Sequence, residues 1–249
     1  MAYQGAGDHF EHINFVEQNF FGKRSKTDVI DLHHDRWTED ERHLHDHITN
    51  ENGTHTTDSY CRYAVETIAA HDPKEPLFMN MAFQAPHWPT QFYQHYADMN
   101  THIPGRKRRE FAAMITQLDD GVRRIMEALK AKDMWQNTVT IAHTDNGGDV
   151  RTGASNFPHR GTKATPWEGG TKAACFIHSM DPRIIPEERR GTTSHALAHV
   201  TDWFPTVSSQ AIRLLLVIDG SILTDCLCKT AHRHGRRRRV LAPAGEAIG

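Results

Sequence analysis

The sequence predicts an α/β fold: a partial, mixed sheet flanked by helices, with an irregular C-terminal tail. Two apolar runs, at 77–83 and 138–142, have the length and composition of buried strands. Between them, residues 106–132 place apolar side chains at helical spacing. A strand, a helix and a second strand in this order favour a parallel β-α-β crossover.

Three segments are expected along the chain. Residues 1–57 are polar, rich in His and acidic residues and without a clear period, which predicts a loop-rich segment. Residues 58–207 contain the strand and helix patterns and form the predicted α/β domain. Residues 208–249 include the basic run Arg236–Arg239 and are predicted to be a divergent, disordered tail.

The composition excludes some classes of function. The 249 residues carry a formal net charge of −2 and a mean hydropathy of −0.63, so there is no overall attraction for nucleic acid or anionic membranes. The longest aliphatic run, 214–218, is far shorter than the roughly 20 residues of a membrane span. The first residues have no signal-peptide pattern. The four cysteines match neither a disulfide framework nor a standard zinc spacing.

Two helices are predicted before the strand at 138–142. Apolar residues over Thr57–His71 predict a helix with Asp58 as its N-cap. The longer helix, Arg106–Lys132, has an apolar stripe at helical spacing, with basic residues before it and after it in the sequence. Its adjacent Asp119 and Asp120 diverge by about 100°, so one of them is expected to pair locally and neither to be catalytic.

The strand at 138–142 leads directly into Asp145-Asn146-Gly147-Gly148. Ligands collect at the carboxyl ends of strands in open α/β sheets. The carboxylate of Asp145 and the amide oxygen of Asn146 are hard ligands suited to Ca²⁺ or Mg²⁺. Lys163, further along the same stretch, brings a positive charge suited to an oxyanion. Taken alone, Asp-Asn-Gly-Gly is also ordinary β-turn chemistry.

The predicted strand at 77–83 brings a second candidate, His87, to the same edge of the sheet. A single histidine after a strand is more typical of a structural or surface position. A further strand is expected at 173–178. The stretch Asn52-Gly53-Thr54 is a glycosylation sequon, which matters only in a secreted protein.

Three linked motifs resemble those of the sulfatase family, most closely its arylsulfatase B branch. They are Thr144–Gly148 (TDNGG), Pro158–Lys163 (PHRGTK) and Trp167–Gly170 (WEGG), in the order that the family has. The resemblance implies an alkaline-phosphatase-like fold, with 58–207 as the C-terminal part of the catalytic domain. It also implies hydrolysis of sulfate esters, with a sulfated glycan or an aryl sulfate as substrate and no nucleic-acid partner.

The resemblance also implies the roles of the candidate residues. Asp145 and Asn146 would bind one Ca²⁺, while His87 and Lys163 would contact the sulfate. Enzymes that resemble arylsulfatase B enter the secretory pathway, so the resemblance implies a lysosomal or secreted glycoprotein. The family's early Asp-Asp ligands and its Lys-x-His segment are missing, which predicts an N-terminally incomplete chain and an incomplete Ca²⁺ ligand set.

Sulfatases act through a formylglycine made from the Cys or Ser of a C/S-x-P/A-x-R motif. None of the four cysteines has this spacing; Cys61, for example, is followed by Tyr63 and Val65. Two functions therefore stay open: a sulfuric ester hydrolase in the complete protein, or an inactive sulfatase-like fragment or oxyanion- and glycan-binding protein without the nucleophile. A His/Cys-rich or basic-tailed module that binds metal or nucleic acid is a third alternative, which the near-neutral charge disfavours.

Overall fold

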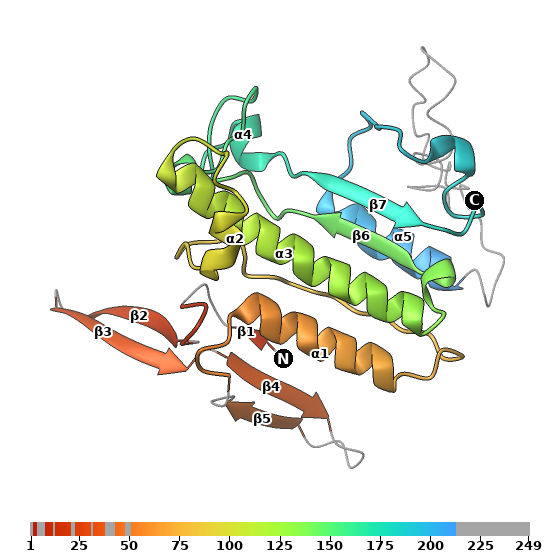
Figure 1. The fold of residues 1–249 in the computed structure, drawn as a ribbon, viewed down its shortest axis with the longest axis horizontal. Coiled ribbons are helices and arrows are strands. Elements are labelled where there is room, and N and C mark those ends of the chain that lie inside the picture. The colour runs from red at the N-terminus through yellow and green to blue at the C-terminus, as the bar shows by residue number, and fades with distance from the viewer. Residues whose placement is uncertain are drawn as a thin grey trace, which may run out of the picture. The chain divides into compact units, whose positions relative to one another are not determined.

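The computed structural model describes residues 2–3, 8–11, 13–20, 23–30, 32–37, 43–47 and 51–212, with side chains at 8–11 and 51–209. Its contacts divide the chain into two units, Met1–Gln136 with Thr140–Ile177, and Asn137–Val139 with His178–Gly249. Helices and short strands make up the described chain (Figure 1), and the predicted α/β class is confirmed. The predicted segment boundaries at 57 and 207 stay predictions.

Both long helices that the sequence predicts are present. Helix α1 spans Thr56–Ala70 and helix α3 spans Arg106–Ala131. The N-cap of α1 is His55, whose imidazole accepts a hydrogen bond from the N–H of Thr57, so the prediction that Asp58 caps this helix is wrong. Asp58 instead accepts hydrogen bonds from Gln117 and Arg124 of α3, because a carboxylate at this place can pair with a cation across the helix interface.

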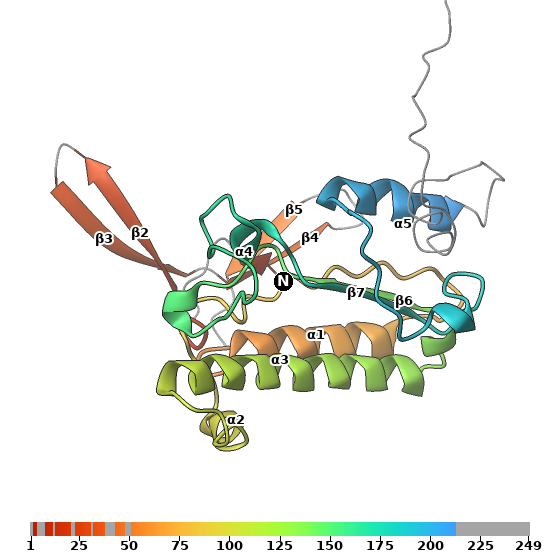
Figure 2. The same ribbon diagram turned by 90° about the horizontal axis from the view of Figure 1, so that it is seen from above.

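Helices α1 and α3 run side by side (Figure 2). Both bury apolar side chains. Cys61 of α1 is fully buried and faces Gly121 of α3. A methyl group on Gly121 would lie 2.4 Å from the Sγ of Cys61, so the helices approach closely only because this residue is glycine. The buried apolar side chains of these two helices are Tyr60, Cys61, Ala64, Ile68, Ala113, Met114 and Leu129.

The short helix α2, Gln94–Asp98, packs on α3 through Tyr96 and Ala97, which lie against Ala113. Tyr96 donates a hydrogen bond to the carboxylate of Asp120 (3.2 Å), and Asp120 also pairs with Arg123 (2.7 Å). Burial, with the Asp120 charge nearby, raises the pKa of Tyr96 to about 12. Asp120 is therefore the locally paired member of its adjacent pair, as predicted.

The strand predicted at 77–83 does not form. Residues 76–84 have no regular secondary structure and belong to none of the described sheets. Partial burial alternates along this segment, and Phe78 is 80% exposed. An extended segment becomes a strand only when a neighbour takes up its backbone N–H and C=O groups. Because none of the described strands does so, the predicted parallel crossover from 77 to 142 is wrong.

The two other predicted strands form. Strand β6 spans Val139–His143 and pairs with strand β7, Cys175–Ser179. The N–H of Thr144 donates to the carbonyl of Ala174 (3.0 Å), and the hydroxyl of Ser179 donates to the carbonyl of Thr138 (3.1 Å). These pairs follow opposite orders along the two segments, so β6 and β7 are antiparallel.

The described residues of the N-terminal segment, which was expected to be rich in loops, form five strands. They are β1 (Ala2–Tyr3), β2 (Ile13–Phe20), β3 (Lys23–Ile30), β4 (Leu32–Trp37) and β5 (His43–His47). Strands β2 and β3 form an antiparallel pair, while β1, β4 and β5 form a three-stranded sheet. Pairing between strands depends on cross-strand neighbours, which a polar sequence without a period does not reveal.

The remaining helical elements are short. In the first unit they are the 3₁₀ turn η2 (Val150–Thr152) and helix α4 (Glu168–Thr171), while η1 (Trp135–Asn137) lies where the two units meet in the sequence. The second unit has η3 (Glu187–Arg189), η4 (Val200–Asp202) and helix α5 (Trp203–Ile212). Among the described residues, no helix combines the length and apolar character that a membrane crossing requires. The predicted tail beyond 212 lies outside the described residues.

Candidate functional site

The TDNGG and WEGG motifs meet backbone to backbone. The N–H of Gly147 donates to the carbonyl of Gly170 (3.0 Å). A methyl group on Gly147 would lie 1.9 Å from the carbonyl oxygen of Gly169, and one on Gly170 would lie 2.3 Å from the carbonyl oxygen of Thr165. Contacts this short leave no space for a Cβ. The contact between the two motifs therefore explains Gly147, while Gly170 is required by its contact with Thr165.

The carbonyl oxygen of Gly148 accepts three hydrogen bonds. They come from the side chain of Asn156 (2.8 Å), the hydroxyl of Thr162 (3.0 Å) and the backbone N–H of Lys163 (3.2 Å). The N–H of Gly148 in turn donates to the Oδ1 of Asn156 (2.8 Å). These bonds attach the backbone of Lys163 to the TDNGG motif. Sequence reasoning missed Asn156 and Thr162, because their partners lie in another part of the loop and leave no local pattern.

The two predicted metal ligands lie at the start of this loop. The side chain of Asp145 is exposed and that of Asn146 is half-buried. The amide nitrogen of Asn146 donates to the carbonyl of Gly147 (2.8 Å), which leaves its Oδ1 available as an acceptor. A carboxylate beside an amide oxygen fits the chemistry of a Ca²⁺ site.

The two residues supply only part of such a site, because Ca²⁺ takes about 6–8 oxygen ligands. Among the side chains that the structure describes, no group of three or more His, Cys, Asp or Glu residues is placed to hold a metal ion.

Lys163 lies in a charged neighbourhood. Hydrogen bonds from Arg151 are the main cause that lowers the pKa of Asp149 to about 2, and the positive charge of Lys163 acts in the same direction. Asp149 is therefore ionised at any physiological pH. The side chain of Lys163 is half-buried, so its charge is less screened by water than that of a fully exposed lysine.

Side chains also join the second and third motifs. The guanidinium carbon of Arg160 lies 3.8 Å from the centre of the Trp167 ring, a cation–π contact. His159 and Glu168 approach to 2.8 Å between Nδ1 and Oε2. The N–H of Gly169 donates to the carbonyl of Arg160 (2.7 Å). All three motifs thus belong to one hydrogen-bonded loop, residues 144–170, which we call the motif loop.

His87 lies on a separate loop of the same unit. Its side chain is exposed, and its Nδ1 lies 2.5 Å from the carbonyl oxygen of Trp88. Because a carbonyl can only accept, this contact places the ring proton on Nδ1 and leaves the Nε2 of the neutral ring as an acceptor. The structure therefore builds the four predicted site residues on two loops: Asp145, Asn146 and Lys163 on the motif loop, and His87 on the other.

A buried pair of imidazoles supports the loop that carries His87. His9 and His55 are both fully buried and stack in parallel, with ring centres 4.9 Å apart and an interplanar angle of 4°. His9 lies 3.1 Å from the hydroxyl of Thr56, and its Nε2 lies 3.2 Å from the carbonyl oxygen of His87. Burial lowers the pKa of His9. Sequence reasoning missed His9, because a lone histidine in a polar stretch gives no signal.

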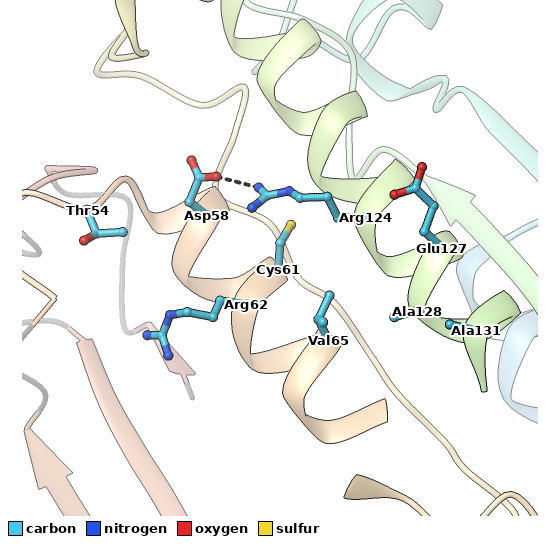
Figure 3. Close-up of a pocket in the computed structure, with 9 residues that line it drawn as sticks. All are labelled: Thr54, Asp58, Cys61, Arg62, Val65, Arg124, Glu127, Ala128 and Ala131. Carbon is cyan, nitrogen blue, oxygen red and sulfur yellow. Dashed lines mark hydrogen bonds and ion pairs between the residues drawn. The ribbon is translucent and has the colours of Figure 1, made fainter. Parts of the chain in front are cut away.

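A surface pocket of about 550 Å³ lies along α1 and α3 (Figure 3). Its lining residues are Thr54, Asp58, Cys61, Arg62, Val65, Arg124, Glu127, Ala128 and Ala131. The charged groups within it are already paired, Asp58 with Arg124 and Arg62 with Glu51 and Glu66. The pocket therefore offers no uncompensated cation for an oxyanion.

One serine has the spacing of the formylglycine motif in its wider form. Ser209 is followed by Ala211 and Arg213, which sequence reasoning limited to cysteines did not consider. It lies in helix α5 of the second unit, and its hydroxyl donates to the carbonyl of Thr206 (2.9 Å). A hydroxyl bonded to its own helix is not presented as a nucleophile, so Ser209 is not assigned a catalytic role.

The chain is similar to known proteins of one family. A family model described as Sulfatase matches residues 6–212. Arylsulfatase J of Mus musculus is 34% identical over 207 residues, which are 83% of this chain and 31% of that protein. N-acetylgalactosamine-6-sulfatase of Rattus norvegicus is 28% identical over 160 residues, 62% of this chain and 28% of that protein. The chain thus spans about a third of the length of the curated relatives it matches.

Solved structures give a similar result. The crystal structure of Ps i-CgsB in complex with k-i-k-neocarrahexaose has a TM-score of 0.61 at 29% identity, over 68% of this chain and 37% of that one. The yidJ protein of Bacteroides fragilis has a TM-score of 0.55 at 16% identity, over 91% of this chain and 48% of that one. This second likeness concerns the fold alone.

Proposed function

This chain belongs to the sulfatase family, and from that premise we propose that it carries part of the active site of an arylsulfatase B-like sulfuric ester hydrolase. The observation that carries the proposal is the motif loop, in which hydrogen bonds tie three motifs of the family together. The carbonyl of Gly148 joins the first motif to the second, and the backbone groups of Gly169 and Gly170 join the third motif to the other two. A loop fixed in this way can hold charged groups in place before a substrate binds, which is how electrostatic stabilisation is achieved.

In this proposal Lys163 and His87 contact the sulfate group. A sulfate ester gathers negative charge on its oxygens during cleavage, so fixed cations and hydrogen-bond donors lower the barrier. The half-buried ammonium of Lys163 supplies the charge. His87 supplies an imidazole that is open to solvent and fixed at its Nδ1 by the carbonyl of Trp88. As an imidazolium it also carries a proton on Nε2, which it would donate to an oxygen of the ester.

Asp145 and Asn146 are proposed as two ligands of a Ca²⁺ ion. The supporting observation is their donor set, an exposed carboxylate next to an amide oxygen that its own hydrogen bond leaves available. When bound, the ion would supply positive charge to the sulfate oxygens. The contribution of the chain is to hold both oxygens at the start of a loop fixed by glycine contacts.

We propose a sulfated glycan as the substrate. Support comes from the names of similar proteins, since Ps i-CgsB was solved with a neocarrahexaose and the rat relative is named for a sulfated amino sugar. A lysosomal or secreted location, and glycosylation at Asn52, belong to the same proposal. The finer choice of ester is left to experiment.

A second candidate function is a sulfatase-like protein that binds sulfated glycans without hydrolysing them. The specific observation in its favour is that none of the four cysteines has the spacing of the formylglycine motif. The oxyanion-binding groups of the motif loop do not depend on that nucleophile, so binding could persist without turnover.

The test compares release and retention of one ligand. The protein expressed from its complete gene is passed over immobilised chondroitin sulfate, and free sulfate is measured with the wild type and with His87→Ala. Release by the wild type, reduced by about 100-fold in His87→Ala, supports the hydrolase. Retention without release supports the binding protein. If the protein neither binds the ligand nor releases sulfate, both candidates are contradicted. Equal release of sulfate by the wild type and His87→Ala contradicts the role of His87.

A further inference from the structure

Three exposed basic side chains gather where helix α3 begins. Lys107 and Arg108 lie in the first turn of α3, and Arg151 lies in the turn η2. All three are exposed, with 86% of the Arg151 side chain accessible. The amino group of Lys107 donates to the carbonyl of Arg151 (3.1 Å), so the two segments are in direct contact. We call these three residues the basic surface.

Two of these charges are not compensated by an acid. Arg108 donates to the carbonyl of Gly153 (2.9 Å), so it and Lys107 both bind neutral backbone groups. Among the described side chains, no carboxylate lies within ion-pair distance of either one. Arg123 on the same helix, by contrast, pairs with both Asp120 and Glu127. The basic surface is thus a local excess of positive charge on a chain whose net charge is −2.

The helix itself does not account for these cations. The N-terminus of a helix carries a partial positive charge, which disfavours basic residues in the first turn. The first turn of α3 contains no acidic residue, and its N-cap Gly105 makes no side-chain hydrogen bond. Where a sequence departs from local stability rules in this way, a functional reason is expected.

The basic surface is continuous with the motif loop. A methyl group on Gly153 would lie 2.3 Å from the carbonyl oxygen of Lys107, so this part of the loop is packed tightly against the start of α3. The N–H of Val150 donates to the hydroxyl of Thr162, the neighbour of Lys163 (3.2 Å). Asp149 pairs with Arg151, and the positive charge of Lys163 also helps to lower the pKa of Asp149. A line of contacts therefore joins Lys163 to Arg151, Lys107 and Arg108.

We propose that the basic surface binds additional sulfate groups of an extended sulfated oligosaccharide, one of whose esters occupies the site at Lys163. This inference rests on the proposed function for the position of that ester. Sulfate monoesters remain anionic at physiological pH, and a guanidinium matches two of their oxygens at once. A repeating polymer of such groups is complementary to a row of cations, two of which, Lys107 and Arg108, have no acidic partner among the described side chains.

Direct binding to the 249-residue chain tests the proposal. The ligands are a chondroitin 4-sulfate hexasaccharide, the corresponding sulfated disaccharide and the desulfated hexasaccharide, measured by calorimetry at low salt. The variant is Lys107→Gln with Arg108→Gln. The matched control is Lys130→Gln with Lys132→Gln, which removes the same charge from the other end of α3, where Lys132 likewise donates to a backbone carbonyl, that of Ala69.

The expected result is a loss of roughly tenfold in hexasaccharide affinity for the Lys107/Arg108 variant, a smaller dependence of affinity on salt, and unchanged disaccharide binding. The Lys130/Lys132 control should stay within about twofold of the wild type. Thermal unfolding of both variants checks that the fold is kept.

Three outcomes would overturn the proposal: equal hexasaccharide affinity of wild type and variant, an equal loss in the control, or equally tight binding of single-stranded DNA of the same charge. Failure of the proposed function is distinguishable, because Lys163→Ala would then leave disaccharide binding unchanged while the basic surface still binds the hexasaccharide.

Discussion

The Nε2 atom of His9 lies 3.2 Å from the backbone carbonyl oxygen of His87. His9 is fully buried, whereas the side chain of His87 is exposed. The buried histidine therefore positions the exposed one through its backbone, and a second buried imidazole, His55, stacks on the first. The loop that presents His87 is held by a contact between residues 78 positions apart.

The first prediction concerns the stability of the fold in acid. Burial lowers the pKa of His9 below its ordinary value of 6.5, so the unfolded chain binds a proton more readily than the folded one. Its contribution to stability is complete above pH 6.5 and is lost as the pH falls through the lowered value. His9→Asn should therefore show a shallower fall in the free energy of unfolding between neutral pH and pH 5.

Urea unfolding at a series of pH values measures this slope. His102→Asn, the same substitution at an exposed histidine, provides the control. If the free energy of unfolding falls with pH equally steeply in His9→Asn and the wild type, the lowered pKa of buried His9 is contradicted.

The second prediction concerns the contact between the TDNGG and WEGG motifs. In Gly147→Ala the new methyl group would lie 1.9 Å from a backbone oxygen of Gly169, which cannot move without distorting the loop. We expect a loss of about 3 kcal/mol or more in the free energy of unfolding. Gly105→Ala is the comparison, since Gly105 has open space and a φ of 83°, and should lose only about 1–2 kcal/mol. A smaller loss of stability in Gly147→Ala than in Gly105→Ala would contradict the close contact between Gly147 and Gly169.

The third prediction is a coupling across the α1–α3 interface. Gly121→Ala alone should destabilise the protein by about 1–3 kcal/mol, because its methyl group would lie 2.4 Å from the Sγ of Cys61. Cys61→Ala removes that sulfur. The double variant should therefore be more stable than the sum of the two single losses predicts, by about 1–3 kcal/mol in chemical denaturation. Simple additivity would mean that the two helices do not approach closely at this point.

The fourth prediction uses thiol chemistry. Burial raises the pKa of Cys61 to about 11, while Cys175 is exposed. At pH 8 iodoacetamide should modify Cys175 at least about 100-fold faster than Cys61, as followed by mass spectrometry of the two peptides. In denaturant the two rates should become similar. Rapid native labelling of Cys61 would contradict the packing of α1 on α3.

Much of the candidate site is predictable from the sequence because its determinants are local. The strand at 138–142, the turn after it and the paired glycines lie within one continuous stretch, and the structure joins the three motifs through that stretch alone. Helices α1 and α3 were equally predictable, since each has an apolar face that repeats at helical spacing.

The failures share a different cause. Residues 77–83 have the composition of a strand, but strand formation depends on a partner that composition does not specify. The side chain of Asp58 pairs with Arg124, 66 positions away, and so does not cap its own helix. The supporting role of His9 likewise depends on distant residues. Each of these features is tertiary, and one sequence gives no local signal for it.

The most direct test of the central claim is the rate of aryl sulfate hydrolysis by the protein expressed from its complete gene, compared with Lys163→Ala. Lys172→Ala, at an exposed lysine just after the WEGG motif, is the matched control. The account predicts that Lys163→Ala lowers turnover by at least about 100-fold, while Lys172→Ala leaves it unchanged. Equal turnover of the wild type and Lys163→Ala would contradict the assignment of the motif loop as the sulfate site.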